Sequence, residues 1–299
     1  VVRRQGPDNA VSKREEAFYG EKIAIYGAGT IGACQATLTS GNGYSTVVIG
    51  HSEEGLSRCR NTMLQNWNDL IAQKLATAAN RRAAMDLVTI TNDVSALRDC
   101  DIVFEAVSED VNIKQRVYSI ITEVCGRDII VVSTTSSIDA AILAEKIENP
   151  ARFLIAHPFQ PVHMLPLVEV VRHTETSEET LNQVCTLLKD LNRQVVMLNR
   201  SVPGFLVNRF AQALFRESIY LIEQGITTAA DIDRAIKYAV GMRYASIGLL
   251  EYYDAVGFGR TGQKAGQGLY DWSEKDEDDF RYRKQAPYFE GVRQWHMPE

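Results

Sequence analysis

The stretch KIAIYGAGTIG (residues 22–32) decides the fold that this chain is predicted to adopt. Its apolar first half indicates a buried strand, and Gly27, Gly29 and Gly32 then form a G-x-G-x-x-G pattern at the start of a helix. Gly27 permits a tight turn, Gly29 lets the backbone approach a pyrophosphate, and Gly32 lets helix and strand pack closely. The sequence therefore predicts a dinucleotide-binding turn.

The helix that follows this turn gives a second reason to expect phosphate there. Its first residues, Thr30 and Ile31, would offer backbone N–H groups and the positive end of the helix dipole to a pyrophosphate. A glycine-rich turn with only a structural role is the alternative. The strand–turn–helix context favours the cofactor.

Short β-branched runs alternate with amphipathic stretches along the first two thirds of the chain. The predicted strands cover residues 22–27, 46–50, 88–91, 101–106, 128–134, 152–157, 167–171 and 194–199. The predicted helices between them include 110–124, 138–147 and 177–191. This order is typical of an α/β fold, a Rossmann-type doubly wound and mostly parallel sheet over residues 21–200.

The pattern changes after this sheet, because no further strand is predicted. Residues 205–224 indicate one long helix with Gly225 as its C-cap, and Thr228 stands where the next helix needs an N-cap. We therefore expect a smaller all-α domain over residues 201–299, which serves substrate binding and dimerisation. Residues 1–20 are expected to form a loose leader.

Composition and charge exclude several classes of function. Hydrophobic residues make up 45% and charged residues 23% of the 299 residues, as in soluble globular proteins. A net charge of −6 without a basic block argues against nucleic-acid binding, and no apolar run approaches the ~20 residues of a membrane span. Five cysteines without metal-ligand spacing indicate reduced thiols, no bound metal and a cytoplasmic protein. They are Cys34, Cys59, Cys100, Cys125 and Cys185.

The end of the second predicted strand bears on the choice of cofactor. NAD enzymes usually carry an acid there for the ribose 2′-hydroxyl, whereas this chain has His51 and Ser52. These two side chains can donate to the 2′-phosphate of NADP, with Arg58 or Arg60 adding positive charge. Alternatively, Glu53 serves from a shifted position, or NAD binds without this contact. The sequence leaves NAD and NADP open.

A histidine and a glutamate suggest an acid–base pair. His157 ends a predicted strand, and Glu169 lies twelve residues on, inside the next strand. If the intervening loop turns the chain back, the carboxylate can fix the tautomer of the imidazole, which then accepts a hydroxyl proton. Taken alone, a loop histidine is more often a surface or packing residue.

The surrounding sequence, HPFQPVHMLPLVEVV (157–171), resembles the signature of the 3-hydroxyacyl-CoA dehydrogenases. In that family a similar segment carries the catalytic His–Glu pair, which implies those roles for His157 and Glu169. FEAVSEDVNIKQRVY also resembles the family's segment beside the nicotinamide ribose. That likeness implies cofactor contacts from Glu109 and Lys114.

Two further elements extend the resemblance over both domains. VVSTTSSIDA (131–140) is similar to the family's serine-pair element, so Ser136 is implied to bind the substrate hydroxyl, and Thr134 replaces the cofactor-facing asparagine. PGFLVNR (203–209) is similar to the element that opens the helical domain, which implies that Asn208 is a hydrogen-bonder to substrate or active site.

Each of these residues also has a plainer interpretation. Ser136 and Ser137 can simply cap a helix beginning at Ile138. Asn208 can be a solvated helix residue, and Lys114 an ordinary surface lysine. Without the resemblance, the plainer account would be favoured for all of them.

Other details resemble a subgroup acting on small free hydroxy acids, which includes L-gulonate 3-dehydrogenase with lambda-crystallin, and L-carnitine dehydrogenase. The segment around GMRYA (241–245) carries this likeness, and Arg243 would then pair with a substrate carboxylate or merely compensate a helix dipole. GQKAGQGLYDW (262–272) resembles the family's closing motif. It follows VGFGR (256–260) almost at once, so either the helical domain is shortened after residue 258 or residues are missing from the sequence near 258–262.

The resemblance implies an enzyme of fatty acid metabolism that transfers a hydride between the 3-hydroxy carbon of a 3-hydroxyacyl-CoA and NAD(P). It also implies a small-molecule substrate and a homodimer. The second hypothesis keeps this chemistry on a free 3-hydroxy acid of the L-gulonate or carnitine type. The third is a silent dinucleotide-binding structural protein, against which the intact set of Ser136, His157, Glu169 and Asn208 argues.

Overall fold

The computed structural model describes residues 22–245, 247–255, 270, 278–279, 282–283 and 285–286. The chain divides into two compact units, Val1–Arg209 and Phe210–Glu299. The expected leader, the expected shortening after residue 258 and most of the expected closing motif lie outside the described residues.

Eight strands of the first unit form one sheet in the order β3-β2-β1-β4-β5-β6-β7-β8. They are β1 (Lys22–Tyr26), β2 (Ser45–Ile49), β3 (Val88–Thr91), β4 (Ile102–Glu105), β5 (Ile130–Ser133), β6 (Phe153–Pro158), β7 (Leu167–Arg172) and β8 (Gln194–Leu198). All neighbouring pairs are parallel except β6–β7, which is antiparallel. The predicted doubly wound, mostly parallel sheet is confirmed, and all eight strands lie where the β-branched runs indicated.

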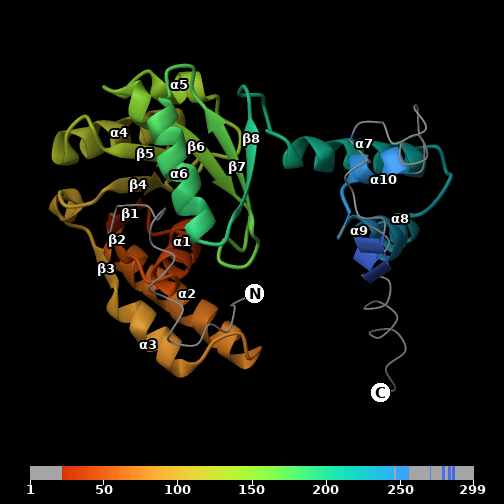
Figure 1. Cartoon of the computed structure of the whole chain (residues 1–299), viewed down its shortest axis with the longest axis horizontal. Helices are drawn as coiled ribbons and strands as arrows, with labels where there is room; N and C mark the ends of the chain where they lie inside the picture. The colour runs from red at the N-terminus through yellow and green to blue at the C-terminus, as the bar shows by residue number, and fades with distance from the viewer. Residues whose placement is uncertain are drawn as a thin grey trace. The chain divides into compact units, whose positions relative to one another are not determined.

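Helices cover both faces of this sheet (Figure 1), which is why its central strands are apolar on both sides. In the first unit they are α1 (Thr30–Gly41), α2 (Glu53–Ala72), α3 (Ala78–Asp86), α4 (Val111–Cys125), α5 (Ala140–Ala144) and α6 (Glu178–Asp190), with short turns η2 (Val94–Leu97) and η3 (Pro150–Arg152). Along β1, Ile23 and Ile25 belong to the core cluster under α1, α2 and α6, whereas Ala24 belongs to the cluster under α4 and α5. Successive side chains of this strand point to opposite faces of the sheet and therefore pack into two separate cores.

Polar residues set where these helices begin. Ser52, Thr77, Asp110, Asp139 and Ser177 are N-caps whose side chains accept backbone N–H hydrogen bonds. Helix α5 is therefore shorter than the predicted 138–147. The idea that Ser136 and Ser137 cap a helix beginning at residue 138 is wrong, because α5 begins at Ala140 and its N-cap is Asp139.

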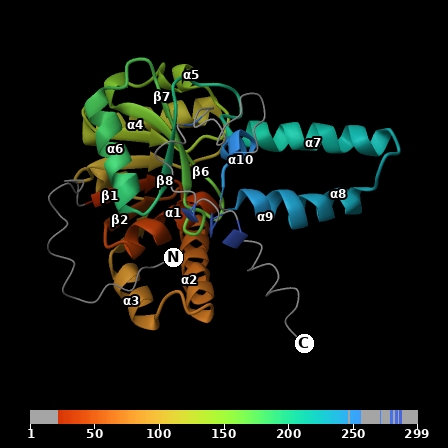
Figure 2. The ribbon, with the colours of Figure 1, turned by 45° about the vertical axis from the view of Figure 1, so that its right-hand side comes forward.

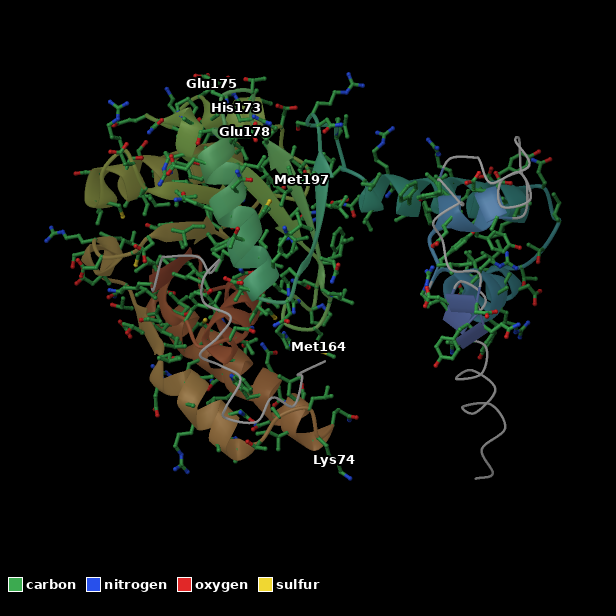
Figure 3. All side chains as sticks on the ribbon, viewed as in Figure 1. Lys74, Met164, His173, Glu175, Glu178 and Met197 are labelled. Carbon is green, nitrogen blue, oxygen red and sulfur yellow. The ribbon has the colours of Figure 1, made fainter. Side chains whose placement is uncertain are left out.

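The sheet positions the site by placing the carboxyl ends of β1, β4 and β5 at one edge. Loops leave this edge toward α1, α4 and α5, and a doubly wound sheet binds its ligands there. The opposite flank of the sheet ends in β8, where the Met197 side chain is 41% exposed (Figure 3).

The second unit is helical throughout its described residues. It contains most of α7 (Val207–Glu223), and α8 (Ala229–Ala235), the π-helical turn η4 (Ile236–Val240), α9 (Gly241–Tyr244) and α10 (Leu249–Ala255). The predicted long helix starts two residues late because Gly204 and Phe205 take positive φ values of 75° and 46°. Gly225, with φ 64°, ends α7 as expected, and the side chain of Thr228 caps α8.

No helix among the described residues combines the length and the apolar character that crossing a lipid bilayer requires.

Candidate active site

The turn between β1 and α1 has a backbone that only glycine can form. Gly27 has φ 137°, and a Cβ there would lie 2.3 Å from the carbonyl oxygen of Ala106. At Gly32 an added Cβ would lie 1.8 Å from the carbonyl oxygen of Gly27. Side chains at these two positions would separate β1 from its neighbour β4 or push α1 off the strand.

Gly29 differs, because an added Cβ there would meet nothing within 4 Å. It is the N-cap of α1, and no side chain caps the first N–H groups of the helix at Thr30 and Ile31. Open space in front of uncapped N–H donors fits the pyrophosphate of a dinucleotide.

The β2–α2 junction holds the residues expected to distinguish the two nicotinamide cofactors. His51 is exposed, and the Ser52 hydroxyl accepts a hydrogen bond from the Gly55 amide at 3.2 Å as the cap of α2. The Arg58 guanidinium is paired with Glu54, one helical turn before it. The positive charge expected to help a 2′-phosphate is thus already offset.

The His157 and Glu169 side chains meet across the antiparallel β6–β7 pair, in which these two residues are direct partners. The Nδ1 atom of His157 lies 2.9 Å from Oε2 of Glu169, and the two residues are 5% and 0% exposed. An ionised carboxylate only accepts hydrogen bonds, so Nδ1 carries the proton and Nε2 keeps its lone pair. This tautomer is the one that a general base requires.

Glu169 is itself fixed by the chain that leads into α7. Its second oxygen, Oε1, accepts from the backbone amides of Leu206 and Val207 at 2.9 and 2.8 Å. Three donors therefore hold a fully buried carboxylate in one orientation. Asn208 follows directly, half-buried in the first turn of α7, and its role toward a substrate stays a prediction.

Aromatic rings fix the plane of the His157 imidazole. The ring of Phe159 contacts it edge-on with centroids 4.6 Å apart, and Phe205 lies tilted at 5.5 Å. The unusual backbone of Phe205 delivers a fully buried ring to this position. By contrast, Met164 on the same β6–β7 loop is 55% exposed (Figure 3).

A compact turn after β5 presents the side chain of Ser136. The Oε1 atom of Glu109 accepts from the Thr135 hydroxyl, the Ser136 amide and the Ser137 hydroxyl at 2.5, 2.9 and 3.3 Å. Ser136 itself is exposed, whereas Thr135 is buried. Thr134 ties the start of the turn to β4, because its hydroxyl donates to the Glu105 carbonyl at 2.9 Å.

Lys114 is not a surface residue, so that interpretation is wrong. It is 1% exposed, and its ammonium lies 2.8 Å from Oε1 of Glu105 and 3.3 Å from Oε2 of Glu109. Partial burial alone would raise the pKa of Glu109, but the Thr135 hydroxyl and the Lys114 charge hold that pKa below its usual value. The ionised form of Glu109 is therefore favoured.

Glu105 is a site residue that the sequence interpretation missed. It is fully buried, and its carboxylate accepts from Lys114, from the Val107 amide and from the hydroxyls of Tyr118 and Ser133. Burial, with the neighbouring carboxylate, raises the pKa of the Tyr118 phenol, which keeps it a donor. An acid at the end of an otherwise apolar buried strand was the signal for this network.

Arg243 belongs to the second unit. Its guanidinium stacks over the Tyr252 ring, 4.6 Å from the centroid, at the end of α9. Pairing of Arg243 with a substrate carboxylate stays a prediction.

Sequence comparison agrees with these features. Residues 22–201 match the family described as 3-hydroxyacyl-CoA dehydrogenase, NAD binding domain, and residues 204–259 match its C-terminal domain. The chain belongs to the 3-hydroxyacyl-CoA dehydrogenase family. This member of the family carries an NAD-binding domain, and the prediction of a nicotinamide-dependent dehydrogenase, made with NAD and NADP both open, is confirmed.

Relatives of this 3-hydroxyacyl-CoA dehydrogenase family member carry more than one name. The L-carnitine dehydrogenase of Staphylococcus epidermidis is 32% identical over 228 residues, which are 76% of this chain and 70% of that protein. A 3-hydroxyacyl-CoA dehydrogenase structure from Archaeoglobus fulgidus has a TM-score of 0.76 at 28% identity and covers 91% of this chain and 99% of its own. The (S)-3-hydroxybutyryl-CoA dehydrogenase of Ralstonia eutropha has a TM-score of 0.71 at 28% identity, covering 74% and 78%.

Proposed function

We propose that this enzyme interconverts a 3-hydroxyacyl-CoA and the corresponding 3-oxoacyl-CoA with NAD. The observation that carries this proposal is the buried His157–Glu169 pair, whose geometry leaves Nε2 of the imidazole as a base. The matching family, and a solved structure named (S)-3-hydroxybutyryl-CoA dehydrogenase, support a 3-hydroxyacyl-CoA as the substrate.

In this proposal each side chain has a definite task. His157 accepts the hydroxyl proton at Nε2, while the negative charge of Glu169 stabilises the resulting imidazolium. Ser136 and Asn208 hold the reacting oxygen by hydrogen bonds, and the turn at Gly29 holds the pyrophosphate. When bound, NAD supplies the hydride acceptor. A silent structural protein has no need to keep this set of side chains.

The second candidate function is the same oxidation on a free 3-hydroxy acid. It is favoured by the 32% identity to an L-carnitine dehydrogenase, and Arg243 would then contact the substrate carboxylate. A steady-state assay at 340 nm separates the two candidates, with acetoacetyl-CoA, L-gulonate and L-carnitine as substrates. We expect the highest kcat/KM with acetoacetyl-CoA. Turnover of the thioester no faster than that of the free acids would instead establish the second candidate.

For the cofactor we propose NAD rather than NADP. The first turn of α2 carries Glu53 and Glu54, and the Arg58 guanidinium is paired with Glu54. The carboxylate of Glu53, in the helix turn that follows this strand, would disfavour a 2′-phosphate by like-charge repulsion.

We expect His51→Asp to raise the ratio of kcat/KM for NAD to that for NADP by about tenfold. A carboxylate at this strand end would accept from the ribose hydroxyls and repel the phosphate. The matched control is Arg82→Gln, an exposed residue on α3 that should leave the ratio within about twofold. An unchanged ratio in His51→Asp would show that this strand end does not contact the ribose.

We also propose a homodimer formed through the second unit. Helix α7 has no buried residue, although its apolar face carries large side chains that are 37–60% exposed. These side chains are Phe210, Leu214, Phe215, Ile219, Tyr220 and Ile222. Helices α7 and α8 run in opposite directions (Figure 2). A groove between them is lined by Leu214, Phe215, Ser218, Ile232, Asp233, Ile236 and Lys237. A second copy would cover this surface.

Leu214→Glu should therefore convert the dimer to a monomer at micromolar concentration, as measured by size-exclusion chromatography with light scattering. A buried carboxylate without a partner is strongly unfavourable in an apolar interface. Gln212→Glu is the control, because it adds the same charge on the polar side of α7 near Arg216. A wild-type chain that elutes as a monomer would overturn the proposed dimer.

We place the reaction in the cytoplasm. All five cysteines lie in the described part of the chain and are free thiols, which supports a reducing compartment.

A further inference from the structure

We propose that Phe205 is a positioning residue for the base. Its left-handed backbone directs two amides at the Glu169 carboxylate, and its ring packs on the imidazole of His157. The proposal rests on the proposed function, in which His157 accepts the hydroxyl proton. It goes beyond that function because it assigns a task in catalysis to an apolar side chain that takes no part in proton transfer.

The backbone before α7 reverses through two consecutive residues with positive φ. Gly204 and Phe205 have φ values of 75° and 46°, and the Phe205 amide donates to the Val202 carbonyl at 3.0 Å. Glycine adopts this left-handed region freely, whereas a bulky residue is an outlier there. A bulky residue persists in such a conformation only where its surroundings hold it. The contacts of Phe205 therefore indicate what the strained turn is for.

The reversal directs two successive amides at one carboxylate oxygen. Oε1 of Glu169 accepts from the amides of Leu206 and Val207 at 2.9 and 2.8 Å. These amides lie at the N-terminus of α7, where the first N–H groups have no partner within the helix. Successive amides in a turn form a concave anion site, and the positive end of the helix dipole adds to it. Glu169, 37 residues before Leu206 in sequence, thus caps α7.

The ring of Phe205 connects the same turn to the imidazole. It is fully buried, its centroid lies 5.5 Å from that of His157, and it belongs to the core cluster that includes Phe153 and Ile155. The other oxygen of Glu169, Oε2, lies 2.9 Å from Nδ1 of His157. The base is therefore held in two ways by the conformation at residue 205, directly by the ring and indirectly through the carboxylate.

Two substitutions separate the contribution of the backbone from that of the ring. Phe205→Gly removes the ring but adopts the left-handed conformation freely, whereas Phe205→Ala removes the ring and keeps a Cβ that disfavours it. We expect kcat to fall about tenfold in Phe205→Gly and at least about fivefold further in Phe205→Ala. The Kd for NAD should stay within about twofold of wild type in both. If Phe205 only filled the core, alanine would be the milder change, because it restricts the unfolded chain.

The matched control is the pair Asn192→Gly and Asn192→Ala. Asn192 has φ 58° on the exposed turn between α6 and β8, so the glycine variant should again have the higher thermal midpoint. The two control variants should differ in kcat by less than about twofold. A kcat in Phe205→Ala equal to or above that in Phe205→Gly would overturn the proposal.

Hydrogen exchange of the full chain, detected by NMR without substrate, tests the turn itself. Phe205→Leu keeps an apolar side chain in the core, which favours folding, but removes the ring that holds the left-handed turn. We expect the amides of Leu206 and Val207 to exchange at least about tenfold faster in this variant, while amides of β1 and β2 keep their protection. Unchanged exchange of both amides would show that Phe205 does not hold the turn, which refutes the positioning role.

A double-mutant cycle tests whether Phe205 acts through the base. In the His157→Gln background, Phe205→Ala should lower kcat by no more than about twofold, against the loss of about fiftyfold or more expected in the wild-type background. Additive effects would contradict the proposal. Failure of the proposed function is distinguishable. A chain that turns over no 3-hydroxy substrate still gives the exchange result, whereas an active chain with unchanged exchange in Phe205→Leu refutes only the role of Phe205.

Discussion

Replacing His157 by glutamine is expected to lower kcat by about 10³–10⁴-fold, the contribution of a well-placed general base. Glutamine fills a similar space and can still donate to Glu169, so the fold and the cofactor turn should persist. It has no nitrogen lone pair with which to accept the substrate proton. Steady-state kinetics with the best substrate measures the loss, and titration with NAD checks that the Kd is retained.

The matched control is His163→Gln, a histidine on the loop that follows β6. It is half-buried, and burial lowers its pKa, but unlike His157 it has no carboxylate partner across the sheet. Its kcat should stay within a few-fold of wild type. If activity survives in His157→Gln but falls in His163→Gln, the base is His163 and the assignment of His157 is wrong.

Replacing Lys114 by methionine is expected to lower the free energy of unfolding by about 3–5 kcal/mol, because it leaves the buried Glu105 carboxylate without its cation. Methionine has nearly the same length, so little of the effect comes from lost packing. Urea denaturation followed by circular dichroism measures the change.

Two further variants separate charge from volume in this result. Lys146→Met removes an exposed lysine near α5 and should change stability by less than about 0.5 kcal/mol. Glu105→Gln in the Lys114→Met background removes the unpaired charge and should restore most of the loss. If the double variant is as unstable as Lys114→Met alone, the ion pair is not the source of stability.

The sheet was predictable because its central strands are buried on both faces. Such strands appear as uninterrupted β-branched runs, and each of the eight runs became a strand. The role of the glycines in the cofactor turn was equally predictable, because steric contacts at Gly27 and Gly32 exclude any side chain. Local sequence was sufficient at these places because the deciding contacts are local or nearly so.

Predictions failed where a distant residue decides the local structure. Helicity was expected from residue 138, but the hydroxyl of Thr135 holds that amide in a turn anchored by Glu109. Lys114 lies on an amphipathic helix, whose periodicity shows which side chains are buried but not that a carboxylate on β4 receives them. These partners are separated by up to 26 residues in sequence.

The His157–Glu169 pair lies between these cases. Its spacing of twelve residues is compatible with many arrangements, and only the resemblance to a family made it a strong prediction. The structure supplies the missing information, namely an antiparallel register in which the two residues face each other. Spacing in sequence cannot give this register, because the length of the loop is independent of it.

That independence has a consequence for how such enzymes change their substrates. Apart from Phe159, whose ring packs on the imidazole, the residues between β6 and β7 lie outside the ladder from Leu154–Arg172 to Pro158–Val168 that pairs His157 with Glu169. A slip by one residue would instead place a valine opposite His157. The register that joins His157 to Glu169 is thus separate from most of the loop that connects the two strands, which suits a family whose members carry names as different as L-carnitine and (S)-3-hydroxybutyryl-CoA dehydrogenase.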